Sequence, residues 1–596
     1  MRRAVLPLCL ALSACTTAPP AAPADARADA PLDAAAPEDS GCAWDGGEET
    51  PPEPALHTPR WAFEPWISKD ISDGADTRAF VRGFQERNIP VGAVVIDSPW
   101  MSQYTTFQAN PSRYPDFGGL IAELHAQGIR LVVWTTQMIN EASHDLEMGG
   151  DTYEGPSPNY YEASAYNYLV NGGQTYFWWK GVGGGLDFMN PEARRWWHRQ
   201  QNQLLDLGLD GYKLDFGENY IPTGTIATAN GVISHQAYSE EYYRDFWAYG
   251  VQRRGRDFLT MVRPWDESYE FEGRFFAKKE HAPVGWVGDN RRDWFGLVDA
   301  LDSMFRSAAA GYVVVGSDIG GYLDRDDDDL MVRIPFDLEV FARWTAVACF
   351  TPFFQLHGRA NLTPWTVPER AAEFTALYRY YATLHHELAP FYYDLAEEAY
   401  AGGPTILSAV VGPEAWKTDP RFWVGAAFLV APPITSGSSL SVELPSGGRY
   451  LDWWDLDGPW LDPQRLDVAT PLDRIPIFVR EGAIIPLAIS STVSRLVPRA
   501  DAGFTIFLAP GPATSRFVHY EDDDTKTGIE AELSSGAAAV RLSRVAKATR
   551  LVVRQDQATT VTLNGAALSS ERWGKEGARV WVKLEASEGP VTISIR

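Results

Sequence analysis

A cation and a carboxylate share one face of a strand-like stretch near the middle of the chain. In GYKLDFGE, residues 211–218, apolar side chains alternate with Lys213 and Asp215. Strand side chains alternate between two faces, so these two residues lie on one face, roughly 6–7 Å apart. The ammonium group favours an ionised Asp215 and lowers its pKa, as a nucleophile in covalent glycosyl transfer needs. The alternative is a structural Lys–Asp pair, although burying such a pair usually adds little stability.

A second stretch, GWVGDNRRDW at residues 285–294, places Asp289 after a turn of small residues, close to Trp286. An acid beside an indole ring is poorly solvated, which raises its pKa and suits a proton donor. Two carboxyl groups shifted in opposite directions are typical of a retaining glycosidase, in which they lie about 5–5.5 Å apart. The alternative is a helix cap, with Asp289 or Asn290 starting the helix predicted over 293–310.

The elements that must position these residues form a repeating pattern. Eight apolar runs alternate with amphipathic, helix-like segments between residues 59 and 395, which predicts a (β/α)₈ barrel. The predicted strands are 61–68, 91–97, 130–136, 211–217, 258–264, 284–290, 311–320 and 350–358. Polar residues follow at or near their ends: Asp97, Asp215, Arg263, Asp289, Asp318 and His357. A barrel places its catalytic groups at these carboxyl ends.

Short apolar runs separated by Gly, Pro, Asn and Asp replace this pattern after residue 395. They predict antiparallel β-sandwich modules, a proximal one over 396–490 and a distal one over 491–596. Residues 16–58 are rich in Ala, Pro and acidic residues and have no apolar period. We expect them to form a disordered tether.

The N-terminus predicts export. Two arginines precede a short apolar stretch that ends in Leu-Ser-Ala-Cys15. The stretch has signal-peptide proportions, and its ending resembles the bacterial lipobox, in which the cysteine becomes the lipidated first residue. We therefore expect residues 1–15 to be a lipoprotein signal peptide, with Cys15 anchoring the protein at a bacterial outer membrane, on its periplasmic face or at the cell surface. The alternative is a plain secretory signal.

Composition narrows the classes of partner and cofactor. The formal net charge of −26 argues against nucleic acid and against an anionic membrane surface. Four cysteines form neither a disulfide framework nor a CxxC site, and the ten histidines are scattered without HExxH spacing. The acidic run 324–329 lacks the spacing of a calcium loop, which favours a solvated loop. We expect no metal and no cofactor.

Six stretches resemble glycoside hydrolase family 31 in order and spacing, over roughly residues 60–490. They are LDFMNPEARRWW, DLGLDGYKLDFGE, GWVGDNRRDW, VVVGSDIGGY, FTPFFQLHG and PLDRIPIFVREGAIIPL. The family contains retaining α-glycosidases with a (β/α)₈ barrel followed by β-sandwich domains. The resemblance implies that Asp215 is the nucleophile and Asp289 the general acid/base of an exo-acting hydrolase.

The same resemblance implies further roles around the −1 subsite, the pocket for the sugar that is released. It makes Asp97 and His357 ligands of sugar hydroxyls, Arg263 a neighbour of the nucleophile, Trp286 a wall of the pocket and Asp318 a buried acid beneath it. One of Trp178 and Trp179 is the candidate for a hydrophobic platform.

Two departures bear on the substrate. Lys213 stands where members that cleave α-glucosides often have Trp, and Gln355 stands where Arg is common. Lys213 is more similar to the α-xylosidase and α-galactosidase branches. The expected partner is an α-glycoside or oligosaccharide; the sugar and the oligomeric state stay open. The competing hypothesis is a non-catalytic, surface glycan-binding lipoprotein on a glycosidase scaffold.

Overall fold

The computed structural model describes residues 53–145, 152–215, 217–268, 273–326, 331–490 and 503–596. The predicted signal peptide, Cys15 and most of the predicted tether lie outside these residues. Within them, every helix is either too short or too polar to cross a membrane.

Eight parallel strands form the sheet that holds the site. They are β1 (Trp66–Lys69), β2 (Ala93–Ile96), β3 (Arg130–Thr135), β8 (Gly211–Leu214), β11 (Leu259–Val262), β14 (Val284–Val287), β15 (Val315–Ser317) and β16 (Gln355–Leu356). Their spatial order is β15-β14-β11-β8-β3-β2-β1-β16, and a parallel bridge between Asp318 and Gln355 brings β15 against β16. The sheet is thus nearly closed, and the predicted (β/α)₈ barrel is confirmed. Seven of these strands lie within their predicted apolar runs, and β1 extends one residue beyond its predicted run, to Lys69.

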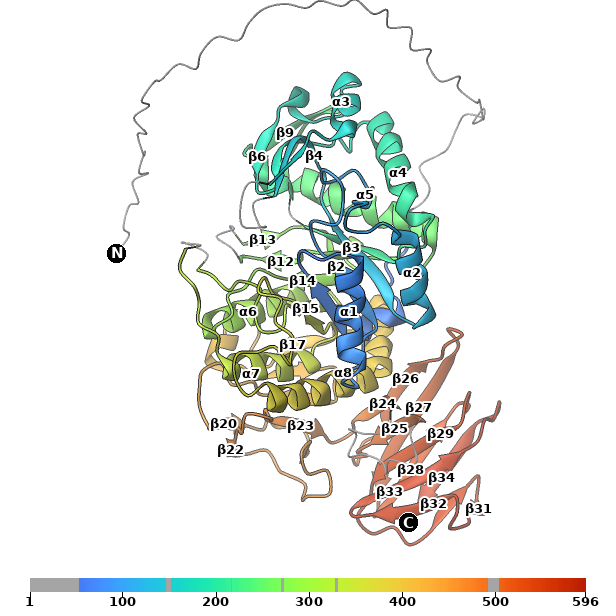
Figure 1. Ribbon diagram of the computed structural model, residues 1–596. Coiled ribbons are helices and arrows are strands. Elements are labelled where there is room, and N and C mark those ends of the chain that lie inside the picture. The colour runs from blue at the N-terminus through green and yellow to red at the C-terminus, as the bar shows by residue number, and fades with distance from the viewer. Residues whose placement is uncertain (1–52, 146–151, 216, 269–272, 327–330, 491–502) are drawn as a thin grey trace, which may run out of the picture. The chain divides into compact units, whose positions relative to one another are not determined.

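Helices cover the barrel in the intervals between strands (Figure 1). They are α1 (Gly74–Gln85), α2 (Phe117–Ala126), α4 (Pro191–Leu205), α5 (His235–Arg254), α6 (Trp294–Ala310), α7 (Leu338–Cys349) and α8 (Ala371–Tyr400). Local sequence fixes several starts. Asn190 caps α4 through its side-chain oxygen ahead of a proline at the first helical position, and Asp293 and Asp337 cap α6 and α7. Strands β2, β8, β11 and β14 are buried along their length, because helices cover the outside and side chains fill the inside.

The connection from β3 to β8 carries a separate antiparallel sheet. Its strands are β4 (Met138–Asp145), β5 (Thr152–Gly155), β6 (Tyr176–Trp178) and β7 (Gly181–Gly185), in the order β5-β4-β7-β6, with α3 (Pro158–Ala165) beside them. A hairpin of β9 (Thr225–Thr228) and β10 (Gly231–Ser234) follows β8, and a second pair, β12 (Trp265–Asp266) and β13 (Arg274–Phe275), follows β11. All three additions leave the barrel at the carboxyl ends of its strands, where the candidate site residues are.

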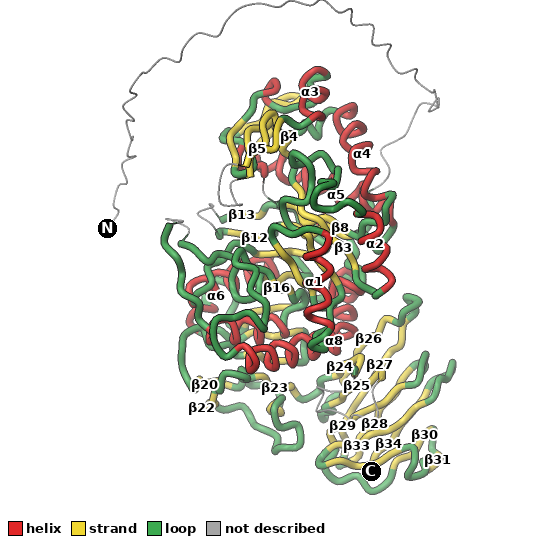
Figure 2. Tube along the Cα trace, viewed as in Figure 1, coloured by secondary structure: helices red, strands yellow, loops and turns green. Residues whose placement is uncertain are grey.

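After α8 the described chain is built from strands, with one short 3-10 turn at Trp416–Thr418 (Figure 2). A five-stranded sheet combines β17 (Leu407–Ala409), β18 (Phe422–Val424), β19 (Phe428–Val430), β21 (Tyr450–Asp452) and β23 (Ile477–Arg480), with β20 (Ser439–Glu443) and β22 (Arg465–Ala469) paired beside it. Two further sheets share a core of their own. One holds β24 (Ile484–Ile489), β25 (Gly503–Leu508), β29 (Thr549–Arg554), β32 (Trp573–Glu576) and β33 (Arg579–Leu584); the other holds β26 (Ser515–Tyr520), β27 (Lys526–Ser534), β28 (Ala537–Leu542), β30 (Val561–Leu563), β31 (Ala566–Ala567) and β34 (Val591–Ile595). Pairing is antiparallel except between β25 and β29, so the predicted change from barrel to sheets is confirmed.

Candidate active site

Asp215 follows β8 directly and points into the mouth of the barrel, with 15% of its side chain exposed. Its Oδ1 accepts hydrogen bonds from Nη2 and Nε of Arg263, at 3.1 and 3.2 Å. Its Oδ2 accepts a hydrogen bond of 3.0 Å from the indole N–H of Trp134, at the end of β3. Each carboxylate oxygen therefore faces a fixed donor. This is the arrangement of an oriented, ionised carboxylate.

Asp289 lies two residues beyond β14, with 16% of its side chain exposed. Nη2 of Arg263 donates a hydrogen bond of 2.6 Å to its Oδ2. Burial raises the pKa of Asp289 to about 7; Arg263 opposes the shift, while Asp215 and Asp266 add to it. The structure rules out the helix-cap alternative, because Asp293 caps α6 by accepting from the backbone N–H of Gly296 at 3.0 Å.

One guanidinium joins the two carboxylates. Arg263 is fully buried, and its Nη2 contacts both Asp215 and Asp289. The two carboxylate oxygens can be no farther apart than these two contacts laid end to end. That limit is compatible with the separation of about 5–5.5 Å expected in a retaining site. Burial disfavours the charge of Arg263, but Asp289, Asp266 and Asp215 raise its pKa above the usual range.

Lys213 faces the same pocket as Asp215, but its direct partner is a different acid. Its Nζ donates a hydrogen bond of 2.6 Å to Oδ2 of Asp97 and lies 3.3 Å from Nδ1 of His357. Burial opposes the ammonium charge, while Asp97 and the more distant Asp215 raise the pKa of Lys213. Arg263, rather than Lys213, is therefore the cation that bonds the proposed nucleophile.

His357 and Asp318 complete the floor of the pocket together with an acid that the sequence did not reveal, Asp70. Nε2 of His357 lies 2.8 Å from Oδ1 of Asp70, and Nδ1 lies 3.5 Å from Oδ2 of Asp318. Burial opposes protonation, but these carboxylates raise the pKa of His357 to about 10. Asp70 also accepts a hydrogen bond of 2.9 Å from the hydroxyl of Tyr322. A signal for Asp70 existed, because it follows the first barrel strand directly.

The floor also has the spacing of a metal site. Ligand atoms of Asp70, Asp97 and His357 lie within 4.8 Å of one another. Lys213 already bonds Asp97, and the raised pKa of His357 keeps its ring protonated near neutral pH. A metal ion requires a neutral histidine as its ligand. The three residues therefore fit an internal ion-pair network better than a cation site.

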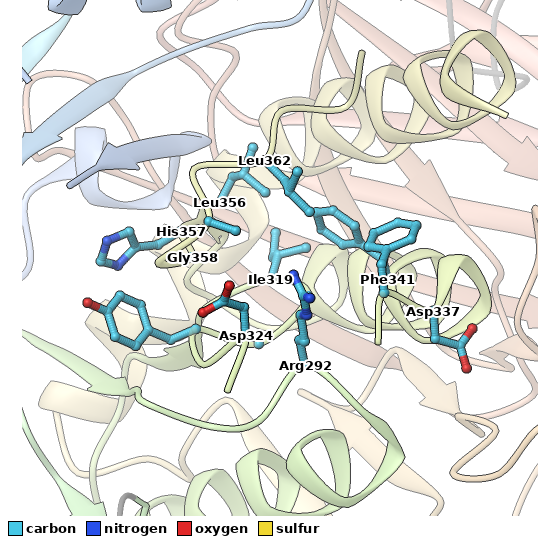
Figure 3. Close-up of a pocket in the computed structure, with 14 residues that line it drawn as sticks. Arg292, Ile319, Asp324, Asp337, Phe341, Leu356, His357, Gly358 and Leu362 are labelled. Carbon is cyan, nitrogen blue, oxygen red and sulfur yellow. The ribbon is translucent and has the colours of Figure 1, made fainter. Parts of the chain in front are cut away.

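His357 also borders another pocket, of mixed polar and apolar lining, with about 380 Å³ of empty space, open solvent included (Figure 3). Phe341, Leu356 and Leu362 line it together with Arg292. The imidazole of His357 points away from Phe341 and Leu362 (Figure 3), and its ring nitrogens contact Asp70 and Asp318. His357 therefore belongs both to the lining of this pocket and to the buried ion-pair network.

Trp286 contacts one cation from each of the two groups of charges. It is 1% exposed, and its ring lies 3.9 Å from the guanidinium carbon of Arg263 and 4.3 Å from Nζ of Lys213. Its indole N–H donates a hydrogen bond of 3.2 Å to Oδ2 of Asp318. The ring thus holds both cations by cation–π contact and anchors the buried acid below them.

The two candidates for the platform have different environments. Trp178 is fully buried and donates its indole N–H to Oδ1 of Asn140 at 2.7 Å. Trp179 is half-buried and packs edge-on against Trp134, with ring centroids 5.5 Å apart. Because Trp134 bonds Asp215, Trp179 is the one that borders the site.

The fold and the site together define a class of protein. Two acids at the carboxyl ends of β8 and β14, held by one guanidinium in a (β/α)₈ barrel, have the geometry of a retaining glycosidase. Residues 55–395 match the model of the glycosyl hydrolases family 31 TIM-barrel domain, and residues 400–485 match that of the family's C-terminal domain. The chain belongs to glycoside hydrolase family 31.

Curated relatives include glucosidases and xylosidases. Alpha-glucosidase 2 of Bacillus thermoamyloliquefaciens is 25% identical over 495 residues, which cover 79% of this chain and 58% of the relative. An alpha-xylosidase of Emericella nidulans is 24% identical over 454 residues, covering 73% of this chain and 54% of the relative. The chain thus spans little more than half the length of these relatives.

Solved structures share the fold. A cycloalternan-forming enzyme from Listeria monocytogenes, in complex with a pentasaccharide substrate, matches with a TM-score of 0.76 at 19% identity, covering 91% of this chain and 55% of its own. A family 31 dextranase from Flavobacterium johnsoniae, complexed with glucose, matches with a TM-score of 0.74 at 21% identity, covering 91% of this chain and 71% of its own.

Proposed function

We propose that the protein is an exo-acting, retaining α-glycosidase that hydrolyses terminal α-linked sugars. The observation that carries the proposal is the contact of one Arg263 nitrogen with both Asp215 and Asp289, in a site where the pKa of Asp289 is raised to about 7. An acid with that pKa is partly protonated near neutral pH. It can therefore donate a proton to a leaving group.

The reaction proceeds in two steps. Asp215 attacks the anomeric carbon while Asp289 protonates the glycosidic oxygen, so that the bond to the leaving group breaks and a covalent β-glycosyl–enzyme forms. Asp289, now ionised, takes a proton from water, whose oxygen attacks the same carbon and releases Asp215. The sugar leaves with its original α configuration. Each step inverts the configuration at the anomeric carbon, so the two steps together restore it.

The residues at the floor of the pocket favour a substrate of the kind that the α-xylosidase and α-galactosidase branches cleave. Lys213 and Asp97 form a buried donor–acceptor pair opposite the catalytic acids, suited to binding sugar hydroxyls. Alpha-xylosidases of Emericella nidulans and Saccharolobus solfataricus are among the relatives, each about a quarter identical to this chain. Both ring nitrogens of His357 face carboxylates of the protein, so we assign hydroxyl binding first to Asp97 and Lys213.

A panel of aryl α-glycosides tests the proposal: xyloside, galactoside, glucoside and sulfoquinovoside, incubated with the purified full chain. We expect release from one of them, with the α anomer appearing first by NMR. Asp215→Ala should abolish release, whereas Asp302→Asn, which alters a buried acid of α6 outside the site, should not. No release from any of these or from α-linked oligosaccharides, together with binding of glycans, would favour the non-catalytic glycan-binding protein instead.

We also propose that Cys15 is lipidated and holds the enzyme at the bacterial outer membrane. The support is the Leu-Ser-Ala-Cys15 ending and the Ala/Pro-rich composition that follows it. Wild type should fractionate with membranes and gain the mass of a lipid at Cys15, and Cys15→Ala should not. Recovery of an unlipidated, cleaved wild-type chain would indicate a plain secretory signal.

A further inference from the structure

The bridging guanidinium has a third partner outside the catalytic pair. Nη1 of Arg263 donates a hydrogen bond to Oδ2 of Asp266, which is 1% exposed at the end of β12. The other nitrogens of Arg263 contact Asp215 and Asp289. Because the guanidinium is planar and rigid, fixing Nη1 sets the direction of Nε and Nη2 as well. The orientation of Asp266 therefore controls how Arg263 faces the two catalytic acids.

Asp266 is itself held by Ser268. Oδ1 of Asp266 accepts hydrogen bonds from the backbone N–H of Ser268 at 2.8 Å and from its hydroxyl at 2.7 Å. The Ser268 hydroxyl also contacts the carbonyl oxygen of Gly288. It has one proton for two acceptors, so it serves them alternately, while the backbone N–H holds Asp266 throughout. Asp266 and Ser268 thus connect Arg263 to the residue before Asp289.

The turn at Gly288 needs such support. A Cβ at this position would lie 2.2 Å from Nε1 of Trp286, so the backbone passes directly against the indole. Asp289 follows with φ of +59°, a left-handed conformation that costs free energy in a residue with a side chain. A hydroxyl contact on the Gly288 carbonyl helps to hold this strained turn. Ser268, which holds Asp266, therefore also contacts the backbone that sets the direction of Asp289.

We propose that Asp266 and Ser268 are positioning residues that fix both Arg263 and the turn before Asp289, and so set the proton affinity and direction of the general acid. The inference rests on the proposed glycosidase function and deepens it. It also explains why an aspartate is buried so close to two other acids: it shares the Arg263 charge that would otherwise act on Asp215 and Asp289 alone.

The charges around Asp289 give the direction of the effect. Arg263, Asp215, Asp266 and Lys213 face it, and burial adds to the two acids in raising its pKa to about 7. Replacing Asp266 by Asn removes one of these negative charges and leaves Arg263 with two acids instead of three. Both changes favour ionised Asp289. The pKa of the general acid must fall.

The test is the pH dependence of kcat/KM for an aryl α-glycoside with a weakly acidic leaving group. Activity falls as pH rises through the pKa of Asp289, so wild type has an alkaline limb near pH 7. In Asp266→Asn we expect this limb to move to lower pH by about half a unit or more, with kcat/KM at the optimum reduced about tenfold. An unmoved limb in a correctly folded Asp266→Asn protein would overturn the inference.

Two variants separate charge from structure. Ser268→Ala keeps the charge of Asp266 and loses the hydroxyl contacts, so kcat/KM should fall a few-fold at every pH without a shift of the limb. Asp302→Asn neutralises a buried acid that bonds Arg306 at 2.7 Å in α6, and it should change neither quantity. If Asp266→Asn does not fold, Asp266→Glu keeps the charge but displaces the carboxylate. It must lower kcat/KM without moving the limb, and full activity there would contradict the inference.

A measurement without substrate keeps this inference separate from the proposed function. In protein labelled with ¹³C at Asp carboxyl carbons, the signal that titrates near pH 7 and disappears in Asp289→Asn reports the general acid. Asp266→Asn should move its midpoint to lower pH. If wild type cleaves none of the glycosides, the proposed function fails, and this titration alone decides whether Asp266 acts on Asp289.

Discussion

Two buried clusters of charge each have a cation in contact with Trp286, and they differ in how firmly their acids hold a proton. In the catalytic cluster, Arg263 is the bonded cation for three acids, Asp215, Asp266 and Asp289. Burial raises the pKa of Asp289 to about 7 there, so its proton can leave and return near neutral pH. In this cluster, three acids share one bonded cation.

The floor cluster has two cations, Lys213 and His357, for the acids Asp70, Asp97 and Asp318. Burial opposes ionisation, yet the pKa values of Asp70 and Asp318 are lowered, chiefly by His357. Burial raises the pKa of Asp97 in spite of Lys213. Similar side chains thus hold fixed charges in the floor cluster and a proton that can leave in the catalytic cluster. The difference follows from the second cation of the floor cluster, which changes the ratio of cations to acids.

The largest expected effect comes from replacing Asp289, the acid whose proton can leave near neutral pH. Asp289→Asn should lower kcat/KM on the order of 10²–10⁴-fold for an aryl glycoside with a basic leaving group, the usual contribution of general acid catalysis. The alkaline limb near pH 7 should vanish. A glycosyl fluoride needs little protonation of its leaving group, and its kcat/KM should fall much less. Equal losses on both substrates would refute the assignment of Asp289 as acid.

The next largest effect comes from removing Lys213, one of the two cations of the floor cluster. Lys213→Met leaves Asp97 and its neighbours buried with one cation fewer, which should cost about 3–5 kcal/mol in the free energy of unfolding of the barrel. Urea unfolding followed by tryptophan fluorescence measures it. The double variant Lys213→Met/Asp97→Asn removes the uncompensated acid and should recover part of the loss. A single variant as stable as wild type would mean that the floor does not need its second cation.

A pH dependence of stability separates the clusters further. The folded-state pKa of His357, about 10, exceeds its usual 6.5, so its contribution is complete below pH 6.5 and is lost as pH rises to 10. The free energy of unfolding should fall on the order of 2–4 kcal/mol over this window. His357→Gln should show a flatter curve than wild type between pH 6.5 and 10. Parallel curves would show that His357 is not held protonated.

The smallest effect concerns Trp286, whose ring contacts a cation of each cluster. Trp286→Phe keeps an aromatic face for both cations but loses the hydrogen bond to Asp318, which should cost about 1–3 kcal/mol and less than tenfold in kcat. Trp416→Phe is the matched control, because Trp416 is equally buried and donates its indole N–H to Asp302 at 2.7 Å away from the site. It should lose similar stability without loss of kcat. A loss of kcat in the control would mean that the effect is general.

Much of the fold followed from local pattern. Buried parallel strands read as continuous apolar runs, and their polar ends marked Asp97, Asp215, Arg263, Asp289, Asp318 and His357, all of which the structure brings to one end of the barrel. Asp70 escaped notice because the first strand was expected to end at residue 68, whereas β1 runs to Lys69 and Asp70 comes next.

The hydrogen-bond and ion-pair partners within the site could not be predicted from the sequence. Lys213 and Asp215 do share a face, but their partners, Asp97 and Arg263, come from other strands that are brought close by barrel closure. The donor from Trp134 and the support from Asp266 depend on side-chain directions that no spacing along the chain encodes. The site roles themselves stay predictions for the experiments above.

The bridge between Asp318 and Gln355 contributes both to the closure of the barrel and to the support of the site. It brings the last strands of the barrel together, and the Gln355 side chain donates a hydrogen bond of 2.7 Å to the same Asp318 that holds Trp286 and faces His357. A fluctuation that parts the barrel here also disrupts the floor of the candidate site in the same event. The backbone amide of Ile319, bonded at 2.9 Å to the carbonyl of Gln355, is therefore a single hydrogen-exchange reporter for both the integrity of the barrel and the competence of its pocket.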